Sequence, residues 1–381
     1  MSAGMGAGMG AGMGMGAGGP ATGAARAATG TRRALDAVMG RVAVTASDVG
    51  PRFPLYAEPD DGRWTTTGRG SWTGGFWAGL LWLRARYTGD EADRSAAAAC
   101  TARLEPWVGA DTATRGLILW YGTAPAGDDA GAAALRARAA RAVLAAHDHE
   151  LGIVPWGDAL GGPRMLARVD GVPGTVPLLA DAGAQGLVAA AAHLRRHLDL
   201  CLGANPPALR PALRFDAGAG WQPCEDPPPG WSRGRAWLLL AVADALLRPG
   251  LAAALSAARL DEALELLLRQ GEFAVPAADS DRPDGPRDTS AAAITAVALL
   301  KLARVPGPRA GRCADRAGAI LSCLAESHVT GRDSGRPPGM LLDGCYDAGK
   351  GLAVRHELIW GDFFLALGLA ALHGVVDITR V

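Results

Sequence analysis

The chain has 381 residues and a formal net charge of zero, with 38 basic and 38 acidic side chains. Hydrophobic residues make up 49% of it and charged residues 20%, which is ordinary for a globular protein. A chain without a basic surplus is not expected to bind nucleic acid or another polyanion as a general partner.

The N-terminal residues 1–29 are dominated by Gly, Met and Ala. Glycine at this density cannot bury enough surface to offset its backbone entropy, so a disordered tail is expected. The segment lacks the basic start and unbroken apolar run of a signal peptide. Because no later stretch approaches the roughly 20 apolar residues of a membrane span, we expect a cytoplasmic protein with no membrane partner.

Beyond residue 30, two kinds of predicted helix alternate along the chain. Helices with one apolar face are predicted at 31–46, 91–106, 129–148, 185–202, 259–272 and 309–326. Helices that are apolar on nearly every face, and therefore buried, are predicted at 73–87, 112–123, 173–183, 231–247, 288–303 and 357–373. Short connections make neighbouring helices antiparallel. The pattern predicts an all-α fold, an (α/α)6 barrel of six helical hairpins forming a single domain over residues 30–381.

Distinctive residues gather just before the predicted inner helices, whose leading loops line one mouth of such a barrel. The segment SWTGGFWAGLLWL carries Trp72 and Trp77 at the start of the first inner helix. A Trp face at a barrel mouth can stack on a sugar ring, but plain core packing explains the same residues.

Three charged residues lie in apolar surroundings. Arg233 begins a buried helix and needs an anionic partner, either a structural Asp or a substrate carboxylate. Asp362 lies inside an apolar helix, where a carboxyl group is either paired or functional. Asp170 precedes an inner helix between Val169 and Val172, an apolar setting that favours the neutral acid needed for proton donation. A helix-capping or turn role explains Asp170 equally simply.

The six cysteines form no CxxC pair and no cluster with His at zinc-ligand spacing. We therefore expect buried, reduced thiols and no metal site.

Several segments resemble, in the same order, those of glycoside hydrolase family 88, the unsaturated glucuronyl hydrolases. They are WTGGFWAGLLWL followed by YTGD, then WSRGRAW, PRDTSAAAI and LIWGDFF. The segment GMLLDGCYDAGKGL is similar to a late loop of that family, and there is a more distant resemblance to the family 105 unsaturated rhamnogalacturonyl hydrolases. The resemblance covers roughly residues 50–375. It implies a barrel enzyme that acts on a small saccharide or glycoside, as a monomer or homodimer.

The resemblance implies a particular reaction. A carboxylic acid protonates C4 of a C4=C5 unsaturated uronyl residue, and the resulting carboxylate activates a water molecule that adds at C5. The hydrated sugar then opens and releases its neighbour. This chemistry needs no metal or organic cofactor.

Four residues match family positions. Asp170 corresponds to the principal acid/base Asp, and Arg233 to the Arg of the family's Trp-Ala-Arg-Gly-Gln segment. Trp72 corresponds to a Trp that lines the sugar site, and Trp156 resembles a Trp on the loop before the acid. Together with Trp77, these are the candidate catalytic and substrate-binding residues.

The chain departs from the family at the second inner helix. The family's His-Asp pair is replaced by Arg115 and Gly116, and Asp111 can substitute for the missing acid only if the loop rearranges. Arg235 replaces the Gln of the Trp-Ala-Arg-Gly-Gln segment, and a family His is lost near Arg214. Arg115, Arg214 and Arg235 are expected to make the pocket more cationic, with Arg115, Arg235 and Asp111 as further binding candidates.

Three functions are compatible with this sequence. The first is a family-88-like hydrolase that retains Asp170 as its only acid/base. The second is a tailoring enzyme that hydrates, eliminates or isomerises an unsaturated or acidic sugar in a specialised pathway. The third is a degenerate barrel that only binds sugar, because a fold does not by itself fix a function.

Overall fold

The computed structural model describes residues 20–203, 209–269 and 274–381, so residues 1–19 of the expected tail lie outside it. The first helix, α1 (Pro20–Val49), begins earlier than predicted, and residues 20–29 are helical and not part of a tail. Two sequence features account for this difference. Pro20 suits the first position of a helix, and the Ala-rich segment that follows has high helix propensity.

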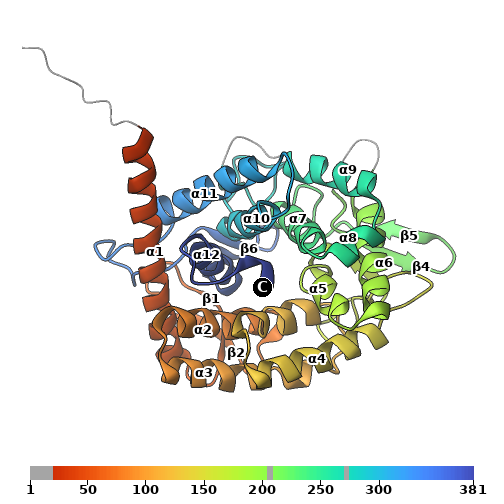
Figure 1. Ribbon diagram of the computed structural model, residues 1–381, viewed down its shortest axis with the longest axis horizontal. Helices are drawn as coiled ribbons and strands as arrows, with labels where there is room; N and C mark the ends of the chain where they lie inside the picture. Colours follow the sequence, from red (N-terminus) through yellow and green to blue (C-terminus); the bar gives the residue numbers. More distant parts are fainter. Residues whose placement is uncertain (1–19, 204–208, 270–273) are drawn as a thin grey trace, which may run out of the picture.

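The two predicted kinds of helix are present and alternate along the chain. The outer helices are α1, α3 (Glu91–Ala102), α4 (Ala130–Ala145), α6 (Ala184–Cys201), α9 (Ala257–Leu268) and α11 (Ala310–Ser327). The inner segments are α2 (Gly74–Thr88), the π-helical turn η3 (Gly116–Trp120), α5 (Thr175–Ala180), α7 (Ser232–Leu246), α10 (Thr289–Leu302) and α12 (Ile359–Leu372). Figure 1 shows α3, α4, α6 and α11 at the periphery and α5, α7, α10 and α12 inside them.

The inner segments form a closed ring. Contacts run from α2 to η3, on to α5, α7, α10 and α12, and from α12 back to α2. The apolar inner helices supply a large share of the core, and α10 and α12 are buried on every face over nearly their whole length. Their all-round hydrophobicity therefore predicted their place correctly.

The apolar faces of the outer helices also match the sequence pattern. In α11 the buried residues are the five that define one face, namely Cys313, Ala317, Ile320, Leu321 and Leu324. In α9 the buried face includes Leu260, Leu264 and Leu267, while residues 270–272 of the predicted helix lie outside the described residues. Spacing at three, four and seven residues thus identifies the side of each helix that faces the ring.

Two inner helices are much shorter than predicted. The segment 112–123 forms the single π-helical turn η3, and 173–183 forms only α5. Glycines at the start of both segments bring the two backbones into contact, which leaves little room for longer helices. A short additional helix, α8 (Pro249–Ala254), follows α7 and was not predicted.

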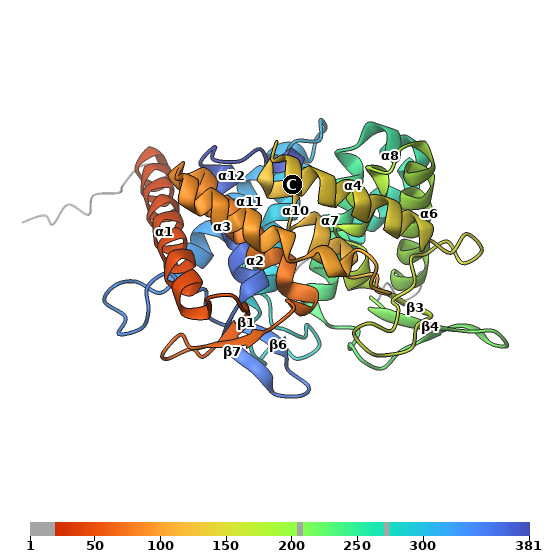
Figure 2. The same ribbon diagram turned by 90° about the horizontal axis from the view of Figure 1, so that it is seen from below.

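The fold is mostly helical, but the prediction of an all-α protein is wrong in one respect. The strands β2 (Trp64–Thr67), β1 (Phe53–Ala57), β7 (Leu352–Leu358) and β6 (Gly344–Asp347) form one sheet in that order. The strands β3 (Leu166–Arg168), β4 (Ala212–Asp216) and β5 (Gly220–Pro223) form a second sheet. Both sheets are antiparallel, and Figure 2 shows the labelled strands at one end of the helical ring. The strands are too short for a clear alternating pattern in the sequence.

All six cysteines are unpaired, and four of them are buried, as expected for reduced thiols. Among the helices of residues 20–203, 209–269 and 274–381, none combines the length and apolar character required to cross a bilayer.

Candidate active site

A cavity of about 830 Å³ lies at the end of the ring that carries the strands. The segment before every inner helix contributes to its wall. In chain order these contributions include Trp72, Thr114, Asp170, Trp231, Pro286 and Tyr346. The segments that are far apart in sequence therefore meet at one mouth, as the alternating helix pattern predicted.

Asp170 projects from the short turn η5 (Val169–Gly171), immediately before α5. Val169 and Val172 on either side are fully buried, and the Val169 N–H donates to the carbonyl of Pro211 at 3.0 Å. These anchors leave the Asp170 side chain on the cavity wall, where it is 16% exposed.

The Asp170 carboxylate is held by Arg168 from the end of β3. Arg168 Nε donates to the two carboxylate oxygens at 2.8 and 3.1 Å. The guanidinium carbon lies 5.1 Å from the ring centre of Trp156 and 5.7 Å from that of Trp231. Burial lowers the pKa of Arg168, but the charge of Asp170 and its hydrogen bond outweigh burial and raise it. The sequence predicted apolar surroundings for Asp170. The structure instead shows an ion pair with Arg168, whose guanidinium lies near two indole rings.

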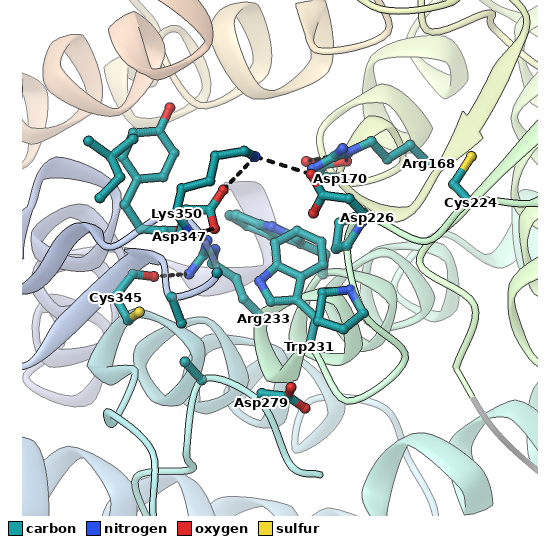
Figure 3. A pocket seen from close by; sticks show the side chains of 18 of the residues that line it. Arg168, Asp170, Cys224, Asp226, Trp231, Arg233, Asp279, Cys345, Asp347 and Lys350 are labelled. Carbon is teal, nitrogen blue, oxygen red and sulfur yellow. Dashed lines mark hydrogen bonds and ion pairs between the residues drawn. The ribbon is translucent and has the colours of Figure 1, made fainter. Parts of the chain in front are cut away.

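Lys350 occupies the rim of the cavity between two carboxylates (Figure 3). Its Nζ lies 2.8 Å from Asp347 and 3.1 Å from Asp226. Burial alone would raise the pKa of Asp347, but hydrogen bonds from Lys350 bring it below its ordinary value. Asp347 is therefore a carboxylate at neutral pH and is unsuited to proton donation.

Asp279 also lines the cavity but holds a turn. Its Oδ1 accepts a hydrogen bond from the Asp281 N–H at 3.0 Å and packs closely against the backbone of Gly230. Asp170 is the wall carboxylate that lies immediately before an inner helix and that the sequence resemblance assigns as acid/base.

Arg233 joins three segments around the cavity. It is 4% exposed and forms an ion pair with buried Asp288, the N-cap of α10. Its Nη1 and Nη2 donate to the carbonyls of Cys345 and Tyr346, each at 2.7 Å. Of the two partners considered for Arg233, the structure contains the structural Asp, so Arg233 supports the wall by holding the β6 segment against α10.

Aromatic rings form much of the cavity wall. Trp72 Nε1 donates to the Tyr346 hydroxyl at 3.0 Å, and the Trp72 ring lies 4.8 Å from that of Trp360. With Trp156 and Trp231 on the opposite segments, the cavity combines flat apolar faces with a few charged groups. This combination is typical of sites that bind small polar ligands such as sugars.

Gly116, the position that the sequence resemblance assigns to a second acid, has no room for a side chain. A Cβ at Gly116 would lie 2.1 Å from the backbone nitrogen of Thr175 and 2.3 Å from its hydroxyl oxygen. Gly174, with φ of +71°, packs equally closely against the Gly116 carbonyl. No side chain fits at residue 116 without a shift of the backbone, so this chain cannot present a carboxylate there.

Comparison with known proteins gives consistent matches. An unsaturated glucuronyl hydrolase from Bacillus sp. (strain GL1) is 28% identical over 366 residues, which cover 87% of this chain and 94% of the relative. Its crystal structure superposes with a TM-score of 0.76 and 25% identity, covering 91% of this chain and 97% of the other. No family model matches.

The chain is a relative of unsaturated glucuronyl hydrolase. A structure described as an Asp-to-Asn variant of such an enzyme with dGlcA-Glc-Rha-Glc has a TM-score of 0.77 at 24% identity. The superposition covers 90% of this chain and 97% of the variant's chain. At 24% identity, this similarity is evidence for the fold alone.

In the present chain, a relative of glucuronyl hydrolase, the cavity brings together four of the predicted site residues: Trp72, Trp156, Asp170 and Arg233. The prediction for Trp77 is wrong, because its side chain is buried in the helical core and does not line the cavity. Its place one turn into α2 turns it away from the mouth.

The predictions for three further residues are also wrong, because they do not line the cavity. Arg115 is buried and donates to backbone carbonyls, including that of Thr112 at 3.0 Å, and burial lowers its pKa. Asp111 pairs with Arg164 at 2.8 Å and braces the loop that carries Trp156. Arg235 lines a separate hollow of about 240 Å³.

The expected excess of positive charge is not found on the described wall. Neither Arg115 nor Arg235 reaches it, and Arg214 is exposed on β4 outside it. The cations that do line the cavity are Arg168, Arg233, Arg282 and Lys350, against the acids Asp170, Asp226, Asp279 and Asp347.

Four residues of this chain that line the cavity were not predicted from the sequence. They are Arg168, Trp231, Tyr346 and Lys350. Arg168 stands two residues before Asp170, and the strand that carries it gave no clear pattern. Trp231 and Tyr346 lie inside motifs that were recognised, so the motif itself was the available signal. Within the described ranges, no group of three or more His, Cys, Asp or Glu side chains is arranged to hold a metal ion.

Proposed function

We propose that this chain is an (α/α)6-barrel hydrolase acting on a saccharide with a C4=C5 unsaturated uronyl residue. Residues 30–381 would form one catalytic unit. The observation that carries the proposal is Asp170, which lines the aromatic cavity and is the residue that the sequence resemblance assigns as acid/base. A ligand with a sugar ring and a carboxylate suits a wall of Trp faces and a guanidinium.

The reaction can proceed with Asp170 as its only acid/base. Protonated Asp170 gives its proton to C4 of the vinyl ether, and positive charge develops at C5 and the ring oxygen. The Asp170 carboxylate then takes a proton from water as the oxygen of that water bonds to C5. The resulting hemiketal opens, and the neighbouring sugar leaves with its glycosidic oxygen. One group can serve both steps because it is returned to its starting form.

The closed position at Gly116 favours a single-acid mechanism over a pair of carboxylates. It also motivates a second candidate function, in which the barrel hydrates or isomerises an acidic sugar without releasing a neighbour. Asp170 would still transfer the proton in this tailoring reaction.

The test is turnover of an unsaturated glucuronyl disaccharide, followed by the ultraviolet absorbance of the enoate and by the reducing sugar released. We expect one mole of reducing sugar to be released for each mole of enoate that disappears. Loss of absorbance without release of sugar would favour the tailoring reaction. No change with any unsaturated uronide would contradict the proposed hydrolase.

A further inference from the structure

We infer that Arg168 binds the carboxylate of the substrate, a role that rests on the proposed function. Arg168 lines the cavity and donates to Asp170 through Nε alone. Among the residues that the structure describes, its terminal nitrogens Nη1 and Nη2 have no hydrogen-bond partner. A guanidinium on the cavity wall with two unused donor groups can accept an anion.

The geometry of a guanidinium allows it to bind Asp170 and a ligand carboxylate at the same time. Its five N–H groups lie in one plane, and the two terminal nitrogens present a pair of parallel donors to a carboxylate. In Arg168 the Nε side is committed to Asp170, so the end formed by Nη1 and Nη2 remains for a ligand. Lysine offers only a point charge and cannot reproduce this fork.

The surroundings of Arg168 hold its plane and strengthen its interactions. The guanidinium carbon lies 5.1 and 5.7 Å from the ring centres of Trp156 and Trp231, and the side chain is only 25% exposed. An ion pair that is largely removed from water is screened less than one on the surface. A carboxylate bound here is therefore expected to contribute more than an exposed pair would.

The other cations of the cavity are less suitable. Both terminal nitrogens of Arg233 already donate to the β6 backbone, and one also pairs with Asp288. Lys350 is engaged by two carboxylates, and the side chain of Arg282 is 80% exposed. Arg168 is the cation that combines burial with unused donors.

This assignment places the reacting atoms beside Asp170. In an unsaturated uronate the carboxylate is attached to C5, and C4 is the next ring atom. A guanidinium that holds the carboxylate with one edge and Asp170 with the other brings C4 toward the proton donor.

The test measures binding and turnover separately. In an Asp170→Asn background, affinity is compared for the unsaturated disaccharide and for the same compound with its carboxyl group reduced to hydroxymethyl. We expect the acid to bind about tenfold to hundredfold more tightly, as charged hydrogen bonds do. Arg168→Gln should abolish this preference, and Arg168→Lys should retain only part of it.

Arg214→Gln is the matched control, because Arg214 is exposed on the neighbouring strand β4 and does not line the cavity. It should leave the preference unchanged. If the preference survives Arg168→Gln, or is absent or unmeasurable while Arg168 is intact, the inference is overturned. If the Arg168-dependent preference is found but the protein with Asp170 intact turns nothing over, the proposed function fails while the carboxylate site stands.

Discussion

Arg233 on the cavity wall forms a buried charged pair with Asp288. Both side chains are almost fully buried, and Asp288 also accepts from the Ser290 N–H at 3.1 Å as the cap of α10. The pair therefore fixes the start of one helix and the backbone of β6 together. Removing one partner of such a pair leaves an uncompensated buried charge, which is strongly destabilising.

We predict that Arg233→Met lowers the free energy of unfolding by about 3–5 kcal/mol. Adding Asp288→Asn should recover part of this loss, because Asn can still cap α10 and no charge is left unpaired. Urea denaturation of the single and double variants measures both effects. A loss below about 1 kcal/mol in the single variant would show that the pair is not needed for stability.

At the scale of elements, the closest approach in the inner ring is between η3 and α5. Gly116 and Gly174 face each other across backbone contacts that leave no space for a side chain. This close contact leaves little room for longer inner segments and excludes a side chain at residue 116. It also means that simple replacement of Gly116 cannot place an acid there.

Gly116→Ala is expected to cost at least about 2 kcal/mol of stability, because its methyl group would overlap the Thr175 backbone. Gly109→Ala is the matched control, since a Cβ there meets no atom within 4 Å. Thermal or chemical denaturation compares the two variants. Equal stability of both would mean that the contact between η3 and α5 is looser than described.

His193 on α6 links the two loops that carry Trp156 and Asp170. Its Nδ1 accepts from the Val154 N–H at 3.0 Å, so its Nε2 carries the proton and faces the Gly171 carbonyl at 3.3 Å. Burial, with a smaller effect of the neighbouring histidines, lowers the pKa of His193 well below its ordinary value. The ring is therefore neutral at working pH and keeps both bonds.

We expect His193→Leu to reduce kcat about tenfold to hundredfold, because both loops lose a positioning bond. His193→Gln can accept and donate at the same positions and should restore much of the rate. Steady-state kinetics on the unsaturated disaccharide distinguish these variants. Equal rates for the Leu and Gln variants would contradict a positioning role for the ring.

The elements that sequence predicted best are those whose burial follows from spacing alone. Each buried residue of α11 was predicted from the sequence, because an outer helix has one buried side and its apolar residues recur at a regular spacing. The short strands at the mouth were missed, since three to seven residues with mixed burial give little periodic signal. Arg168 was missed with them, because its importance depends on Trp156 and Trp231, which are close only in space.

On the scale of the whole molecule, the first outer helix and the last inner helix meet beside a buried charge cluster. Arg41 of α1 donates to Glu357 of β7 at 3.0 and 2.6 Å, and Asp362 of α12 interacts with Glu357. Burial and then the charge of Glu357 raise the pKa of Asp362 well above its ordinary value. The sequence indicated that Asp362 is buried, and the structure places it beside Glu357, with its Oδ1 lacking a hydrogen-bond partner among the described residues.

This cluster predicts a pH-dependent stability. With its raised pKa, folded Asp362 keeps a proton that the unfolded chain loses above about pH 4, so its contribution is fully present at low pH and declines as pH rises. The stability of Asp362→Asn relative to the natural protein should therefore increase as pH rises from 5 to 6, by up to about 1.4 kcal/mol per pH unit. Denaturant midpoints across that range test this, and a constant difference would contradict it.

The central claim is that Asp170 alone supplies the acid and the base. The most direct measurement is the ultraviolet absorbance of an unsaturated glucuronyl disaccharide incubated with the natural protein and, in parallel, with Asp170→Asn. We predict that the enoate signal disappears with the natural protein and persists with the variant, which should still bind the sugar. Equal loss with both proteins, or no loss with the natural protein, would contradict the claim.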